Sequence, residues 1–292
     1  MAGARLVTLT VIGATGQLGC ELAIALQPLG ELQLIGHADL EIADANAVEA
    51  VISASKPDVV FNCAAFHKTD LCEVEPDRAF LLNAIAVRDI ADSCARHAAI
   101  FVHFSSDYVF DGLKGDRYVE TDPTSPVNTY GASKLAGEYL AFARCDRTYV
   151  FRGASLFGGG GSKQKGGNFV DGMLRRAAAG ETLRVVDDIV MSPTATADAA
   201  IAVAEAIRRG LPFGRYHLVN DGACSWCAFA REIVRAGGYD LPVEATRSDA
   251  APQAIRRPPN SSLEARALAQ HGITLPPWQD AVGRYIRERT GA

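Results

Sequence analysis

A glycine-rich turn near the start of the chain constrains its fold more than any other feature. The turn reads Gly13-Ala-Thr-Gly16-Gln-Leu-Gly19; an apolar run at residues 6–12 precedes it and a helical run at residues 20–26 follows. In this order the first glycine makes a tight turn, the second lets backbone amides approach a pyrophosphate, and the third lets the helix pack on the strand. The pattern predicts a dinucleotide-binding βα unit.

Strand-like and helix-like stretches alternate after this unit. We expect strands at residues 32–36, 57–61, 99–104 and 148–151, and helices at residues 47–55, 77–97 and 128–143. Alternation of this kind predicts an α/β protein built on a Rossmann-type, doubly wound parallel sheet. Ligands of such sheets bind beyond the carboxyl ends of the strands.

Beyond residue 155 the pattern loosens. We expect residues 1–155 to form an NAD(P)-binding Rossmann domain and residues 156–292 a smaller mixed α/β substrate domain, with a partial return to the main sheet around residues 194–222. Short strands are expected at 183–186 and 216–219, and helices at 168–179, 195–209 and 226–236. The glycine-lysine stretch at 158–167 fits either a lid, with Lys163 and Lys165 near a substrate pyrophosphate, or a surface loop.

Composition excludes several classes of partner. The 292 residues carry a formal net charge of -5, with 29 Lys+Arg against 34 Asp+Glu, so there is no basic field for nucleic acid or an anionic membrane. We find no export signal or membrane-spanning run. Seven scattered cysteines suit reduced thiols. We therefore expect a cytoplasmic protein that binds neither nucleic acid nor membrane.

No metal site is predicted. Cys224-Ser-Trp-Cys227 has the spacing of a zinc knuckle, but a structural zinc normally takes four Cys or His ligands. No second paired motif accompanies these two cysteines.

Tyr130 and Lys134 lie four residues apart and so share one face of the predicted helix at 128–143. A cationic neighbour favours phenolate, so we expect Lys134 to lower the pKa of Tyr130 from about 10 towards the working pH of an acid catalyst. Ser106 follows the strand at 99–104 and could share a substrate carbonyl with Tyr130. Alone, the pair also fits a solvated helix surface, and Ser106 also fits a turn cap.

Together these residues resemble the extended short-chain dehydrogenase/reductase family. Within it, further segments are similar to the dTDP-4-dehydrorhamnose reductase family, from residue 6 to about residue 278: Ser105-Ser-Asp-Tyr-Val-Phe-Asp-Gly112, Asp122-Pro-Thr-Ser-Pro-Val-Asn-Thr-Tyr-Gly131, Asn168-Phe169, Val185-Val-Asp-Asp188, Ser192-Pro-Thr194 and Arg257-Pro-Pro-Asn-Ser261.

The resemblance implies reduction of the C4 ketone of a nucleotide-linked 4-keto-6-deoxyhexose by NADPH, with dTDP-4-dehydrorhamnose as the first candidate. Tyr130 would protonate the developing alkoxide, Lys134 would hold the nicotinamide ribose, and Ser106 would hydrogen-bond the carbonyl. Besides Tyr130 and Lys134, the implied cofactor contacts are Gly13, Thr15, Gly16, Gln17, Leu18, Gly19, Asp39, Leu40, Ala64 and Ala65. The implied substrate contacts are Ser106, Asp107, Ser155, Asn168 and Arg257.

Two positions bear on the choice of cofactor and substrate. An acidic residue at the end of the second strand would favour NADH, but Gly36-His37 stands there, which favours NADPH. Asp39, slightly further on, keeps NADH open. Ser155 stands where well-known reductases have a tryptophan that lines the nucleotide-sugar pocket, which leaves the nucleotide and the sugar open.

Other functions stay open on the same fold. A sugar-nucleotide dehydratase or epimerase is one, although dehydratases place an Asp-Glu pair where this chain has Asp107-Tyr108. A non-catalytic NADP-binding regulatory subunit is another. A homodimer is also open, but no carboxylate cluster supports the magnesium-bridged dimer of some relatives.

Overall fold

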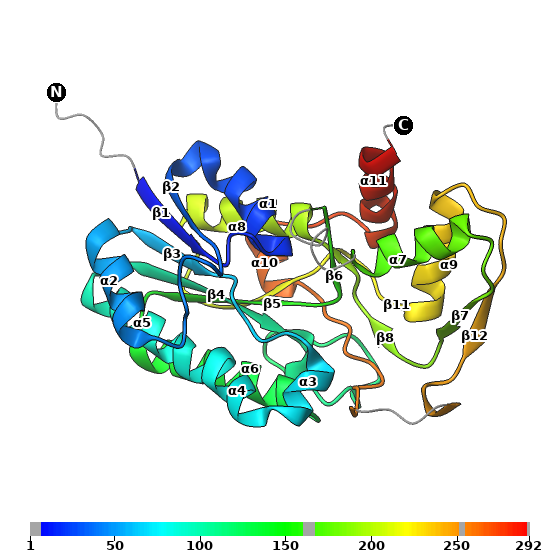
Figure 1. Ribbon diagram of the computed structural model, residues 1–292, viewed down its shortest axis with the longest axis horizontal. Helices are drawn as coiled ribbons and strands as arrows, with labels where there is room; N and C mark the ends of the chain where they lie inside the picture. The colour runs from blue at the N-terminus through cyan, green and yellow to red at the C-terminus, as the bar shows by residue number, and fades with distance from the viewer. Residues whose placement is uncertain (1–6, 160–166, 251–254, 291–292) are drawn as a thin grey trace.

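A six-stranded parallel sheet forms the centre of the computed structural model, which describes residues 7–159, 167–250 and 255–290 (Figure 1). Its strands, in spatial order, are β10 (Gly214–Leu218), β5 (Thr148–Gly153), β4 (Ile100–Ser106), β3 (Val59–Asn62), β1 (Val7–Ile12) and β2 (Gly30–Ile35). All neighbouring pairs run parallel. The predicted Rossmann-type sheet is confirmed. Its strand order reverses between β1 and β3, so a ligand crevice is expected at the carboxyl ends of these strands.

Helices cover both faces of the sheet (Figure 1). One face carries α1 (Gln17–Leu26), α8 (Thr196–Arg209) and α10 (Arg266–Gln270); the other carries α2 (Ala45–Ser55), α5 (Ala86–Arg96) and α6 (Thr129–Arg144). The inner strands β3 and β5 are buried on both faces, which is why they are mostly apolar. α8 packs on one face of this sheet and β10 is its edge strand next to β5.

The helix expected at residues 77–97 is interrupted. It consists of α4 (Pro76–Phe80), a π-helical turn η2 (Leu81–Ile85) and α5, and the short helix α3 (Thr69–Val74) precedes it. The π turn contains Asn83, whose side chain donates to the Phe66 carbonyl oxygen and to Ser133 Oγ, both at 3.0 Å. Asn83 thereby ties the segment after β3 to α6. Such π turns often lie at functional sites.

A second lobe lies to the right in Figure 1. It combines α7 (Phe169–Ala178), α9 (Trp226–Ala236) and α11 (Trp278–Thr290) with three strand pairs: β7 (Leu183–Val186) with β12 (Val243–Thr246), β8 (Val190–Met191) with β11 (Cys224–Ser225), and β6 (Leu156–Phe157) with β9 (Thr194–Ala195). Its own core includes Phe157, Met173, Phe229 and Val282. The domain boundary at residue 155 stays a prediction.

Some expectations fall partly outside the described residues. In the glycine-lysine stretch at 158–167, residues 160–166 lie outside the described residues, and these include Lys163 and Lys165. In the first predicted strand, Leu6 lies outside them. Within the described part of the chain, no helix has both the length and the apolar character of a membrane span.

Helix α6 approaches the π turn so closely that one of its positions admits only glycine. A Cβ atom on Gly137 would lie 2.1 Å from the Asn83 carbonyl oxygen, which is buried backbone. A Cβ atom on Gly172, in α7, would meet nothing within 4 Å.

We expect Gly137→Ala to lower the free energy of unfolding by about 1–3 kcal/mol, because α6 must shift away from η2. Gly172→Ala is the matched control and should raise this free energy by up to about 1 kcal/mol through helix propensity. Urea unfolding of both variants measures the difference. A Gly137→Ala protein as stable as the control would contradict the close approach.

Candidate active site

The glycine turn between β1 and α1 forms a cradle of backbone amides. Gly13 has φ +79°, and a Cβ atom there would lie 2.8 Å from the Ala64 amide nitrogen. A Cβ atom on Gly19 would lie 2.3 Å from the Gly13 carbonyl oxygen, so this glycine is needed for α1 to pack on the turn. Gly16 is the N-cap and has no side chain, so the first amides of α1 carry no side-chain cap. An anion suits this position.

The other predicted contacts of this turn differ in exposure. Thr15 is exposed, and Gln17 Nε2 donates to the Leu156 carbonyl oxygen at 3.2 Å. The side chains of Leu18 and Leu40 are buried in the cores on opposite faces of the sheet. Both leucines therefore have only backbone atoms to offer a cofactor.

The turn after β2 begins with Gly36 and His37, so neither of its first two positions carries an acidic side chain. The Asp39 carboxylate accepts a hydrogen bond from the Gly36 amide at 2.8 Å, and His37 is exposed. Gly36 also lies against Thr15, since a Cβ atom there would be 3.0 Å from Thr15 Cγ2. Thr15, Gly36 and Asp39 thus form one surface beside the glycine turn.

The end of β3 supplies the next part of the crevice. Ala64 and Ala65 follow β3 and are partly exposed, and the Ala64 amide donates to Asn62 Oδ1 at 3.1 Å. Their small side chains leave the backbone accessible opposite Gly13. The structure therefore brings Ala64 to the glycine turn, as a dinucleotide site requires.

Tyr130 and Lys134 lie on the first turns of α6. Asn128 caps this helix by accepting from the Gly131 amide at 2.8 Å, and its Nδ2 donates to the Arg256 carbonyl oxygen at 2.9 Å. A Cβ atom on Gly131 would lie 2.0 Å from the Tyr108 carbonyl oxygen. Glycine at this position lets the start of α6 lie directly on the segment after β4.

The Lys134 side chain reaches the sheet. It is 2 % exposed, and its Nζ donates to the Phe104 carbonyl oxygen at 2.6 Å and lies 3.5 Å from His103 Nε2. Burial lowers the pKa of Lys134 to about 8, opposed by the negative charge of Glu138. Burial and the Lys134 charge hold the pKa of His103 well below its usual value, so this histidine is neutral.

Ser106 and Asp107 lie at the carboxyl end of β4, where the 3₁₀ turn η3 (Asp107–Val109) begins. Ser106 Oγ donates to Asp107 Oδ1 at 2.8 Å, and Ser261 Oγ donates to Asp107 Oδ2 at 2.5 Å. Asp107 is only 3 % exposed. Burial raises its pKa to about 6, opposed by the hydrogen bonds from Ser261 and Ser106. The carboxylate is therefore held at the site against a desolvation penalty.

The structure brings Ser106 close to Tyr130, near enough for the Ser106 hydroxyl to affect the pKa of the phenol. The expected direction of the Tyr130 pKa is wrong. Desolvation raises the pKa of the phenol above its ordinary value, although the hydrogen bond with Ser106 opposes this. The four-residue spacing predicts that the Lys134 charge sets the pKa of Tyr130. In the structure the Lys134 ammonium instead donates to the Phe104 carbonyl oxygen. Tyr130 is consequently a neutral proton donor in this structure.

Tyr108 is a site residue that the sequence analysis missed. Its ring packs edge-on against Tyr130, with ring centroids 5.8 Å apart and planes at 77°. Its hydroxyl is hydrogen-bonded to Arg257, and burial raises its pKa to about 12. Arg257 Nη2 in turn lies 3.1 Å from Asp70 Oδ1. Tyr108 thus links Tyr130 to Arg257, and Arg257 in turn links this group to Asp70 at the start of α3.

Two predicted substrate residues have other surroundings. Ser155 follows β5 in a left-handed conformation with φ +43°, and its carbonyl accepts from the Thr194 amide at 3.3 Å. Asn168 caps α7 by accepting from the Asp171 amide, while its Nδ2 donates to Gly158 O and to the Tyr285 hydroxyl. Both polar atoms of Asn168 are therefore engaged within the protein. Its role at a substrate, like that of Ser155, stays a prediction.

Metal ligands do not gather in the described residues, where no group of three or more His, Cys, Asp or Glu side chains could hold an ion. Cys224 lies on β11 and Cys227 on α9, and burial raises the pKa of both thiols.

A cavity of about 380 Å³ lies away from Tyr130 and Ser106, between α1, the segment after β6 and α11; Glu21, Phe157 and Arg284 are among its lining residues.

Comparison with known proteins agrees with this geometry. The family model "RmlD substrate binding domain" matches residues 7–290. The spore coat polysaccharide biosynthesis protein SpsK of Bacillus subtilis (strain 168) is 38% identical over 283 residues, which cover 97% of this chain and 98% of that protein. The dTDP-4-dehydrorhamnose reductase of Escherichia coli (strain K12) is 36% identical over 293 residues, covering 95% of this chain and 96% of the enzyme.

Solved structures give the same result. The dTDP-4-dehydrorhamnose reductase of Bacillus anthracis str. Ames, in complex with NADP, superposes with a TM-score of 0.92 at 31% identity, covering 97% of this chain and 100% of that one. The UDP-glucose 4-epimerase of Thermus thermophilus, at 18% identity and a TM-score of 0.80, shares the fold alone. The chain belongs to the dTDP-4-dehydrorhamnose reductase family.

Proposed function

We propose that the protein uses NADPH to reduce the C4 ketone of a nucleotide-linked 4-keto-6-deoxyhexose, with conversion of dTDP-4-dehydrorhamnose to dTDP-L-rhamnose as the first candidate. The observation that carries this proposal is the placement of Ser106, at the carboxyl end of β4, beside the buried phenol of Tyr130. Two hydroxyls held together at the edge of a dinucleotide-binding sheet suit the oxygen of a ketone. Family membership supports the same chemistry.

The residues of the crevice fit a dinucleotide. The uncapped amides of α1 after Gly16 suit its pyrophosphate, and Gly13 brings this turn within close approach of the Ala64 backbone. Gly36 and exposed His37 leave room for a 2′-phosphate, because the Asp39 carboxylate is turned to the Gly36 amide. When bound, NADPH supplies the hydride. The protein supplies position and a proton.

Tyr130 and Ser106 act on the ketone oxygen. Tyr130 would donate to it and give up its proton as negative charge develops on that oxygen, while the Ser106 hydroxyl would turn its proton from Asp107 to the same oxygen. The desolvated phenol holds this proton at neutral pH. Lys134 has a pKa of about 8 and stays largely cationic at neutral pH, so its charge would stabilise the phenolate that remains. Together the hydride at C4 and this proton at oxygen convert the ketone to an alcohol.

Two further residues suit the rest of the substrate. Asp107 accepts from Ser106 and Ser261, and its buried carboxylate would orient a sugar hydroxyl. Arg257, fixed by Tyr108 and Asp70, places a cation near Tyr130 where a nucleotide diphosphate carries negative charge. Tyr108, bound to Arg257, stands where dehydratases carry an acidic residue, which favours a reductase.

The quaternary state and the location of the protein also remain proposals. We propose a cytoplasmic enzyme, supported by seven cysteines that form no disulfide among the described residues. A homodimer stays a prediction.

The proposed function is tested by following NADPH and NADH absorbance with dTDP-4-keto-6-deoxyglucose and its 3,5-epimerase, and with other nucleotide sugars in parallel. We expect NADPH oxidation that requires the ketone. Tight cofactor binding without oxidation of either cofactor would instead support a non-catalytic binding protein.

Tyr130→Phe should reduce kcat by about 10²–10⁴ while leaving the Kd for NADPH nearly unchanged, because it removes the proton donor and keeps the ring. Tyr139→Phe is the matched control: it removes a phenol on the same helix that is 56% exposed, and it should retain full activity. Steady-state kinetics and cofactor fluorescence give the two constants. Activity retained in Tyr130→Phe would refute the assigned role.

His37→Asp should weaken NADPH binding relative to NADH by about tenfold, because a carboxylate at this exposed position repels a 2′-phosphate and accepts from a 2′-hydroxyl. His37→Asn, which adds no charge, is the control. Dissociation constants for both cofactors measure the ratio. An unchanged ratio in His37→Asp would place the 2′-phosphate elsewhere.

Asp107 should make stability depend on pH. Its pKa rises from 3.8 to about 6 on folding, so the native state keeps a proton that the unfolded chain loses between these values. The free energy of unfolding therefore falls as pH rises from about 4 to about 6. Relative to Asp107→Asn, the wild type should lose on the order of 1–3 kcal/mol between pH 4 and pH 7. Urea unfolding at both pH values tests this, and identical pH dependence in the two proteins would contradict it.

A further inference from the structure

Three buried polar atoms in the described part of the chain lack a hydrogen-bond partner within the protein. They are Ser105 Oγ, Arg152 Nη1 and His217 Nε2. Their residues are 9%, 2% and 0% exposed. An unpaired buried polar atom costs about 1–3 kcal/mol, so three of them in one protein call for an explanation.

These three residues form a single row across the sheet. In the parallel register Ser105 on β4 pairs with Arg152 on β5, and Arg152 pairs with His217 on β10. Paired residues of parallel strands direct their side chains to the same face, and neighbouring strands lie about 4.8 Å apart. The three side chains therefore lie on one face of the sheet, with Arg152 between Ser105 and His217.

The surroundings of Arg152 identify this face and the free donor. Arg152 Nε and Nη2 donate to the two carboxylate oxygens of Glu138 at 2.8 and 2.7 Å, so the row faces α6. Nη1 is the remaining guanidinium nitrogen. The Phe110 ring closes the region, since the guanidinium carbon lies 5.2 Å from its centroid and the His217 ring meets it edge-on at 5.7 Å.

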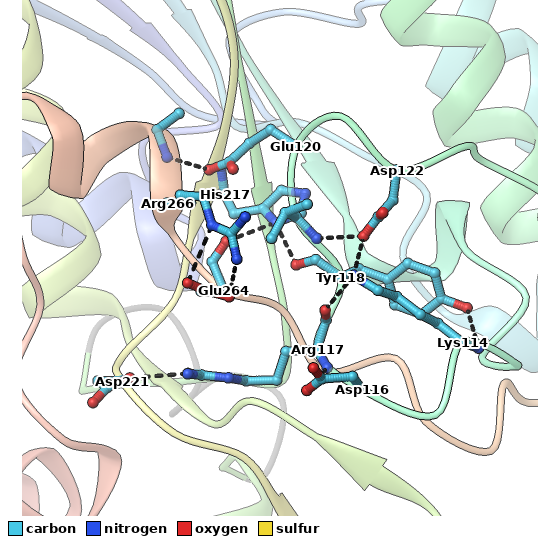
Figure 2. A network of polar contacts seen from close by, with 12 residues as sticks. Lys114, Asp116, Arg117, Tyr118, Glu120, Asp122, His217, Asp221, Glu264 and Arg266 are labelled. Carbon is cyan, nitrogen blue, oxygen red and sulfur yellow. Dashed lines mark hydrogen bonds and ion pairs between the residues drawn. The ribbon is translucent and has the colours of Figure 1, made fainter.

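His217 supplies an acceptor. Its Nδ1 lies 3.1 Å from the carbonyl oxygens of both Tyr118 and Glu264, so Nδ1 carries the proton (Figure 2). Burial and the Arg152 charge lower the pKa of His217 to about 3, so Nε2 is unprotonated at neutral pH. The Glu120 carboxylate further fixes the strand by accepting from the His217 amide at 3.1 Å.

One donor, one acceptor and one hydroxyl match the hydrogen bonds of a single water molecule. The water would accept from Arg152 Nη1, donate to His217 Nε2 and form a third bond with Ser105 Oγ, and buried waters typically make about three such bonds. A halide would suit the arginine but would meet the lone pair of His217 Nε2. The arrangement therefore favours water over an anion.

We propose that Ser105, Arg152 and His217 bind one ordered internal water that holds the carboxyl end of β4 against β5 and β10. Ser105 directly precedes Ser106, and Glu138 lies on the same stripe of α6 as Tyr130 and Lys134. The three residues are thus positioning residues for the site, and this functional part rests on the proposed reduction.

A high-resolution crystal structure of the full chain tests the water directly. We expect a water peak within about 3.2 Å of all three atoms. A direct bond between Arg152 Nη1 and His217 Nε2 would overturn the proposal, as would an anomalous peak at this position in a crystal soaked in bromide. This test needs no activity, so it stands even if the protein reduces no nucleotide sugar and the proposed function fails.

Ser105→Ala tests the positioning. We expect kcat to fall about tenfold with an unchanged Kd for NADPH, because Ser106 loses its restraint while the cofactor cradle is untouched. Ser93→Ala is the matched control, since it removes a buried hydroxyl bonded to Glu49 on α2. An unchanged kcat in Ser105→Ala, or an equal loss in Ser93→Ala, would overturn the positioning role.

Discussion

The buried ion pair between Glu138 and Arg152 is the interaction on which the site depends. Glu138 is 0% and Arg152 3% exposed in their side chains, and Arg215 adds a third charged contact at 3.2 Å from Glu138. Removing one partner of such a pair typically costs about 3–5 kcal/mol, because the other charge stays buried. The pair fixes the face of α6 that carries Tyr130 and Lys134 against β4 and β5. Glycines at 131 and 137 let the same helix lie directly on the segment after β4 and on the π turn η2.

Burial gives the site its chemistry and also costs stability. It raises the pKa of Asp107 and of Tyr130 and lowers that of Lys134, so each charged form is disfavoured relative to water. A phenol that keeps its proton until charge develops, beside an ammonium that stays largely cationic at neutral pH, is useful where a ketone oxygen must be protonated. Such groups mark functional sites because folding alone gives no reason to bury them.

Much of this arrangement could be predicted from the sequence. The glycine turn, the alternation of strands and helices, and the four-residue spacing of Tyr130 and Lys134 are local patterns. The structure places the glycine turn at the carboxyl end of β1, and it places Lys134 against the carboxyl half of β4. The π turn at Leu81–Ile85 could not be predicted, because helical periodicity continues through it. The contact of Tyr108 with Arg257 joins segments that lie far apart in sequence. The predicted direction of the Tyr130 pKa shift was wrong, because burial raises this pKa more than a nearby positive charge lowers it. Burial cannot be read from the spacing of residues in the sequence.

The most direct test of the account follows the hydride. With NADPH deuterated at C4 on the transferred face and a nucleotide-linked 4-keto-6-deoxyhexose, we expect NMR to show one deuterium at C4 of the sugar for each NADPH oxidised. Oxidation without deuterium at C4 of the sugar, or no oxidation although the cofactor binds, would contradict the claim that this site reduces a sugar ketone.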